Sequence, residues 1–184
     1  MPSNSKFSVE IPNEIIEQAK SGSSDAFEQI YRTYSKGCYL LAWRILGNEA
    51  LAQDIVHDVF IKVMNKIQTF QANGYFAGWL RKIVVRESIN RVKVEAKIHL
   101  ISDDDLHSIE CTDLFNNNWL SSCHDLEALT CHLSTTSRAV LFLHEVEGYN
   151  HKEIALLFNK SESFSKVTLS RAYRTLKKTL AEQE

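Results

Sequence analysis

Proline is almost absent from this sequence, and glycine is scarce. The 184 residues include two prolines, Pro2 and Pro12, and six glycines. Because proline interrupts helices and interior strands, nothing after Asn13 is broken by it. Strand-like alternation of apolar and polar residues is missing as well, so we predict an all-α fold with short turns.

Long apolar runs and the apolar core of a signal peptide are also missing. No window approaches about twenty uninterrupted apolar residues, so we expect no transmembrane helix and a cytoplasmic protein. The four cysteines of such a chain do not indicate a disulfide scaffold. Apolar residues make up 44% and charged residues 24%, a composition typical of globular domains.

Helical periodicity divides the chain into two domains. After an N-terminal arm and short helix at 1–24, of which residues 1–12 are expected to be loose, the first domain spans 25–98 and the second 125–184. Asp25 with Glu28 and Asn150 with Glu153 fit capping boxes, and Asn48 can cap a further helix. The predicted helices are 13–20, 25–46, 49–68, 76–97, 135–146, 150–158 and 163–180. Residues 99–124 have no period and are interpreted as a flexible linker.

Net charge conceals strong charge segregation. The total is −2, yet residues 80–98 carry +4 and residues 160–180 carry +5. Between them, residues 99–137 contain seven acidic side chains and no lysine or arginine. Basic blocks of this kind can meet phosphate, although a solvated helix face explains a charge run equally well.

The last two predicted helices have helix-turn-helix spacing. A short helix at 150–158 precedes a four-residue turn and a basic helix at 163–180. Leu169, Ala172, Tyr173, Leu176 and Leu180 are predicted to be its buried face. Polar and cationic residues that suit a DNA groove lie mainly opposite: Ser163, Lys166, Ser170, Arg171, Arg174 and Lys178.

A second basic stripe lies on the helix 76–97. Its members are Lys82, Arg86, Asn90, Lys93 and Lys97. The segment just before it contains Phe70, Asn73 and Tyr75, whose side chains could stack on or hydrogen-bond unpaired bases. Phe76 and Trp79 are instead expected in the core.

The helix 49–68 has a wide apolar face, which includes Met64, and a polar face that contains one apolar residue. That polar face comprises Asp54, His57, Asp58, Ile61 and Lys62, followed by Asn65. An apolar residue with a polar rim is typical of a protein contact, although a lone exposed apolar side chain is common.

In order and spacing these motifs resemble the extracytoplasmic-function group of bacterial RNA polymerase sigma factors. The matching stretches are 25–34, 52–60 and 76–83 in the first half, then 133–155 and 163–176 in the second. The first half contains Ala52-Gln-Asp54-Ile-Val-His-Asp58-Val-Phe60, and the second contains Glu147-Gly148-Tyr149 followed by Glu153-Ile154-Ala155. The sequence departs from the family pattern at Arg86, where asparagine is usual, and at residues 163–166.

The resemblance implies two helical domains, core RNA polymerase and promoter DNA as partners, and neither enzymatic activity nor a cofactor or bound metal. It assigns polymerase binding to Asp54, His57, Asp58, Ile61 and Lys62. It assigns the melted minus-ten element to Phe70, Asn73, Tyr75, Lys82, Arg86, Asn90 and Lys93. The helix-turn-helix residues named above would read the minus-35 element as duplex DNA. An anti-sigma factor is a further candidate partner, and no obligate homo-oligomer is expected.

Two alternatives remain open at this point. A stand-alone helix-turn-helix regulator would explain residues 133–180 but leave the first basic stripe without a role. A metal or thiol redox sensor would use the cysteines and histidines around the linker: His107, Cys111, Cys123, His124, Cys131 and His132. An enzyme is disfavoured, because no phosphate-binding glycine loop, zinc-protease motif or nucleophile elbow occurs.

Overall fold

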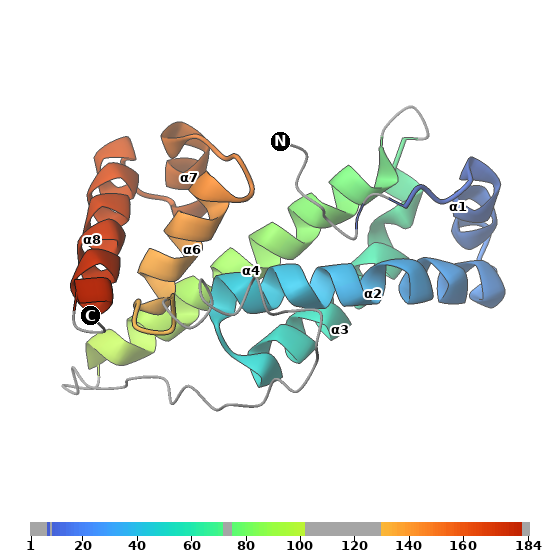
Figure 1. Cartoon of the computed structure of the whole chain (residues 1–184). Coiled ribbons are helices and arrows are strands. Elements are labelled where there is room, and N and C mark those ends of the chain that lie inside the picture. The colour runs from blue at the N-terminus through green and yellow to red at the C-terminus, as the bar shows by residue number, and fades with distance from the viewer. Residues whose placement is uncertain (1–6, 8, 72–74, 102–129, 182–184) are drawn as a thin grey trace. The chain divides into compact units, whose positions relative to one another are not determined.

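The computed structural model describes residues 7, 9–71, 75–101 and 130–181, and within these residues the chain is helical with no β-strand. Figure 1 shows the helices in chain order. They are α1 (Asn13–Lys20), α2 (Ser24–Leu46), α3 (Glu49–Lys66), the 3₁₀ turn η1 (Ile67–Thr69), α4 (Phe76–Ile101), α6 (Thr135–Glu145), α7 (His151–Phe158) and α8 (Glu162–Ala181). The all-α prediction is confirmed for this part of the chain.

The chain divides into two compact units. The first comprises residues 1–43 and 48–88, and the second comprises residues 44–47 and 89–184. The division falls within α4, which extends to Ile101 instead of ending near residue 97. The predicted domain ranges remain a prediction, and most of the predicted linker lies outside the described residues.

Aromatic side chains join the helices of the first unit. The Phe60 ring of α3 makes edge contacts with Phe27 and Tyr31 of α2, at centroid distances of 6.2 and 4.7 Å. Tyr34 of α2 lies 5.8 Å from Phe76 of α4. The unit's fully buried side chains include Ile16, Ile30, Tyr34, Val59, Val63, Leu80 and Val84, so each of its helices contributes to one apolar core.

Two predictions about the N-terminal part of the first unit are wrong. The expected capping box of Asp25 and Glu28 is wrong: α2 begins at Ser24, Ser23 Oγ accepts a hydrogen bond from the Ala26 amide, and Glu28 pairs with Arg32. The described part of the supposedly loose arm is anchored, because Phe7 is only 5% exposed.

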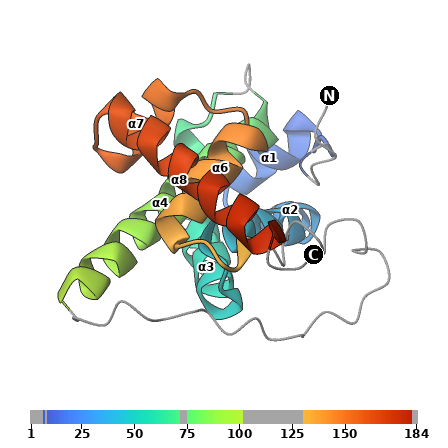
Figure 2. The same ribbon diagram turned by 60° about the vertical axis from the view of Figure 1, so that its left-hand side comes forward.

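Capping interactions between residues close in the sequence fix where helices of the second unit begin and end. Figure 2 shows these helices from another side. Asn150 and Glu153 form the predicted capping box of α7, and Ser134 Oγ accepts from the Ser137 amide at the start of α6. Asn159 ends α7 in the left-handed conformation with φ 54°, which asparagine tolerates better than most residues. The α6, α7 and α8 helices pack on one another around side chains that include Val140, Leu143, Ile154, Leu169 and Ala172.

Several residues expected in the core are exposed instead. Met64 of α3 is 58% exposed, and on α8 Tyr173 and Leu180 are 42% and 48% exposed. Small hydroxyl residues, Ser165 and Thr168, are buried on α8 alongside Leu169 and Ala172. None of the helices in the described ranges combines the length and the apolar composition that a membrane span requires.

Candidate nucleic-acid and protein interfaces

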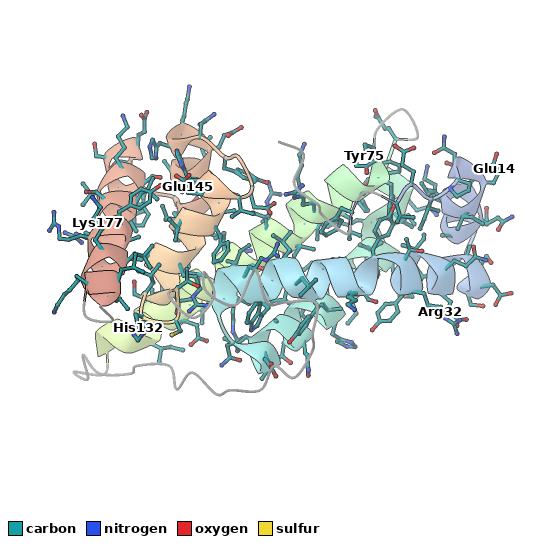
Figure 3. All side chains as sticks on the ribbon, in the orientation of Figure 1. Glu14, Arg32, Tyr75, His132, Glu145 and Lys177 are labelled. Carbon is teal, nitrogen blue, oxygen red and sulfur yellow. The ribbon has the colours of Figure 1, made fainter. Side chains whose placement is uncertain are left out.

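The outer face of α8 is polar and cationic. Each of the six residues predicted from the helix-turn-helix pattern is exposed: Ser163, Lys166, Ser170, Arg171, Arg174 and Lys178. Lys177, labelled in Figure 3, joins Lys166, Ser170 and Arg174 around a shallow hollow of about 440 Å³. These cations can reach phosphate oxygens, and the serines can hydrogen-bond phosphate or base edges.

Lys166 forms an ion pair within α8. Its ammonium lies 2.7 Å from the carboxylate of Glu162, one turn earlier on α8. The hydrogen bond from Lys166 holds the pKa of Glu162 below its usual range. Both side chains are exposed, so the pair contributes little stability and can separate when a phosphate approaches.

A hydrogen-bonded pair, missed by sequence reasoning, fastens α8 to α6. The Tyr173 hydroxyl donates to the Glu145 carboxylate at 2.6 Å, and His144 Nδ1 lies 2.7 Å from the same oxygen. Figure 3 labels Glu145. The bond to Glu145 raises the pKa of Tyr173 to about 12. The pKa of Glu145 is lowered, chiefly by the hydrogen bond from Tyr173 and to a lesser extent by the one from His144.

We predict that this pair makes stability depend on pH. Because the pKa of the Glu145 carboxyl is lower in the folded than in the unfolded state, its ionised form stabilises the fold at pH values above the unfolded-state pKa. This contribution is lost as the pH falls through the folded-state pKa. Glu145→Gln should therefore lower the melting temperature at pH 7, and its deficit should shrink as the pH falls below about 4.3. Thermal unfolding followed by circular dichroism measures both effects. Tyr173→Phe, which removes the larger cause, should weaken the same dependence; an unchanged deficit at acidic pH would contradict the prediction.

A second contact, which the sequence analysis did not predict, joins the first turns of α7 and α8. His151 Nδ1 lies 3.0 Å from the hydroxyl of Ser165, which is fully buried. The His151 ring stacks on His144 at a centroid distance of 4.6 Å. Nothing in the local periodicity indicates these contacts, because they join three different helices.

The basic stripe of α4 is presented outward. Lys82, Arg86 and Asn90 are exposed, and Lys93 is half-buried. On the other side of the helix, Val84, Val85 and others are buried. Burial of one side therefore leaves a row of cationic and amide side chains that can meet a nucleic-acid backbone.

The aromatic residues before α4 divide into buried and exposed ones. Phe70 is 5% exposed and packs on Phe76 and Trp79 at 5.2 and 5.4 Å, so the prediction that its ring is open to bases is wrong in this structure. Tyr75, by contrast, is 48% exposed just before α4, and Figure 3 labels it. Asn73 lies outside the described residues. Phe76 is buried as predicted, and Trp79 is half-buried.

The predicted protein-contact face of α3 is exposed at Asp54, His57, Asp58 and Ile61. Ile61 is 45% exposed and is joined one turn on by Met64, which sequence reasoning had placed in the core. Lys62 differs from the others, because its ammonium forms an ion pair with Glu87 of α4. Lys62 therefore links two helices of the first unit, and its availability to a partner is reduced.

The cysteine and histidine set of the sensor alternative is described only in part. His107, Cys111, Cys123 and His124 lie outside the described residues. Cys131 is disulfide-bonded, which sequence analysis did not predict, and Cys38 is a buried thiol whose pKa burial raises to about 12. No group of three or more metal-ligating side chains occurs in the described residues, and a disulfide sulfur is not the thiolate that zinc requires.

Two family models match the chain. The model of sigma-70 region 2 matches residues 30–98, and the model of sigma-70 region 4 matches residues 123–176. The first range includes α3 and the α4 stripe, and the second includes α6, α7 and most of α8.

Curated relatives agree with these matches. The chain is 37% identical over 78 residues to the ECF RNA polymerase sigma factor SigW of Bacillus subtilis, covering 42% of each protein. It is 29% identical over 175 residues to the ECF RNA polymerase sigma factor BldN of Streptomyces coelicolor, covering 91% of this chain and 65% of the relative. The chain spans about half the length of the curated relatives it matches.

A similar fold occurs in the sigma factor RpoE of Bartonella quintana, solved in complex with the anti-sigma factor NepR. The TM-score is 0.51 at 19% identity, over 84% of this chain and 96% of that one. This likeness supports the fold.

Proposed function

The chain belongs to the sigma-70 family of RNA polymerase sigma factors, and from this premise we propose that it is a promoter-specificity subunit of bacterial RNA polymerase. It binds the core enzyme, recognises minus-35 and minus-ten promoter elements, and helps to open the promoter. The observation that carries this proposal is the presence of two outward cationic faces, on α4 and α8, in the segments that match regions 2 and 4.

The polymerase is proposed to bind the exposed face of α3. Asp54, Asp58 and Ile61 are its centre, because an apolar side chain beside two carboxylates suits a partner surface with an apolar pocket and a cationic rim. Met64, exposed next to Ile61, extends that apolar surface. Lys62 is assigned a supporting role through its ion pair with Glu87.

Promoter DNA is proposed to bind at two places. The α4 residues Lys82, Arg86, Asn90 and Lys93 follow the backbone of the minus-ten region, and Tyr75 stacks on an unpaired base. The outer face of α8 reads the minus-35 duplex through phosphate contacts and base edges. The energy of opening comes from these contacts, so the chain needs no cofactor and carries out no chemical step of its own.

An anti-sigma factor is proposed as a regulatory partner, because the solved relative was crystallised with one. Such a protein would cover the surfaces that the polymerase needs. We propose that the chain acts in the cytoplasm, where it meets polymerase and DNA.

Co-purification with bacterial core RNA polymerase tests the proposed function. We expect a stoichiometric complex that starts transcription from promoters which the core enzyme alone does not use. The chain's helicity, measured by circular dichroism, verifies that it is folded. A folded chain that forms no complex would eliminate the sigma-factor proposal and favour the stand-alone regulator.

A further inference from the structure

The N-terminal segment is bound to the part of the first unit that precedes and begins α4. We name Phe7 together with residues 9–11 the N-terminal strap. The main-chain carbonyl of Phe7 accepts a hydrogen bond from the Tyr75 hydroxyl at 2.6 Å, and the carbonyl of Val9 accepts one from the Tyr34 hydroxyl at 2.7 Å. The strap therefore joins a residue of α2 and the residue just before α4.

The side chain of Phe7 fixes the strap in place. Its ring is 5% exposed and stacks on Tyr34 with a centroid distance of 6.2 Å and an interplanar angle of 20°. The guanidinium of Arg81 lies 6.0 Å from the Phe7 centroid, within range of a cation–π contact. Tyr34 is itself fully buried, and burial raises its pKa to about 12.

The hydroxyl of Tyr75 is held by a hydrogen bond while the ring stays open and lies close to Gly78. Its hydroxyl is bonded to the strap, and its Cδ1 lies 3.2 Å from the position that a Cβ on Gly78 would take. The ring is nevertheless 48% exposed. Glycine at position 78 permits this close approach, because even an alanine methyl group would press on the ring.

We propose that the N-terminal strap is a positioning element of the minus-ten site, holding the Tyr75 ring in the orientation in which it stacks on an unpaired base. This inference rests on the proposed function. Fixing the ring before DNA arrives removes the ordering cost that a free side chain would incur on binding, a difference of about 2- to 10-fold in affinity. Phe7 acts through Tyr75 and needs no contact with DNA.

The test uses the complex of the full chain with core polymerase. The probe is a thymidine oligonucleotide with 2-aminopurine at one position, because stacking on an aromatic ring accepts any base and quenches this fluorophore. Core polymerase without the chain supplies the background. Tyr75→Ala, which deletes the ring, should abolish the chain-dependent quenching.

Two variants isolate the strap. Tyr75→Phe keeps the ring but loses the bond to the Phe7 carbonyl, and Phe7→Ala loses the anchor. Each should weaken probe binding about 2- to 10-fold. Because both substitutions break the same link, the double variant should bind the probe as tightly as the single variant with the lower affinity. Phe7→Tyr, which retains the stack on Tyr34, should restore binding, whereas a merely destabilised fold would also lose polymerase binding. Glu14→Ala, at an exposed position of α1 outside the strap, is the control and should leave probe binding unchanged.

The outcomes separate the two levels of the proposal. Loss of quenching in Tyr75→Ala together with normal binding in Tyr75→Phe and Phe7→Ala would overturn the strap inference and leave the proposed function standing. Fully additive effects of Tyr75→Phe and Phe7→Ala would also overturn it, because the two residues would then act separately. Failure of the wild-type chain to bind polymerase would overturn both the function and the inference.

Discussion

Replacing Asp54, Asp58 and Ile61 with alanine is expected to abolish co-purification with core RNA polymerase. These exposed side chains lie on one face of α3, at steps of four and three residues. The substitution removes two carboxylates and an apolar side chain together, and residues at the centre of an interface can each contribute about 2 kcal/mol or more. A loss of about 4 to 6 kcal/mol would lower the affinity at least about 1000-fold.

The control for this variant is an exposed triple on another helix. Asp25, Glu28 and Gln29 of α2 are exposed and include two carboxylates, so their replacement changes the net charge by the same amount. This control should bind polymerase as the wild type does, and both triples should unfold near the wild-type temperature. Binding that survives the α3 triple would keep the sigma-factor function and move the interface elsewhere.

Features set by short-range interactions were predictable from the sequence. The α7 helix begins at His151 because Asn150 and Glu153 exchange hydrogen bonds within three residues. Asn48 likewise caps α3 by accepting from the Leu51 amide at 3.0 Å. The exposed cationic faces of α4 and α8 follow from helical periodicity, since the apolar residues of each helix identify its buried side.

Features set by contacts between distant segments were not predictable from one sequence. Phe70 has no local property that distinguishes a buried ring from an exposed one; its burial depends on Phe76 and Trp79. Met64 continues an apolar row of α3, yet it is 58% exposed, so the helices described by the structure leave that end of the row largely uncovered. Lys62 and Glu87 are 25 residues apart in the chain, and only the packing of α3 beside α4 brings them together.

The N-terminal arm illustrates the same limit. Its composition is that of a loose terminus, and the hydrogen bonds that anchor it come from Tyr34 and Tyr75. Because these donors are 25 and 68 residues from their acceptors in the chain, periodicity and capping rules carry no information about them. The loop residue Tyr75 was identified as a nucleic-acid candidate, but its link to Phe7 was not.

The second large effect is expected on α8. Replacing Arg171, Arg174 and Lys178 with alanine should weaken binding to duplex promoter DNA by about two to three orders of magnitude at 0.1 M salt. Each cation that neutralises a phosphate releases counterions, so the slope of log affinity against log salt should become less negative by about 2.7. The binding measurement uses the polymerase complex and a duplex selected from a random pool by the wild-type complex.

A charge-matched triple separates specific phosphate contacts from a general loss of positive charge. Arg32, Lys36 and Lys66 are exposed cations of α2 and α3, and their replacement with alanine changes the net charge equally. We expect this triple to leave the salt slope nearly unchanged, because α8 supplies the minus-35 phosphate contacts. If both triples changed the slope by the same amount, the charges would act only through the overall field of the protein, and α8 would lose its assignment as the minus-35 reader.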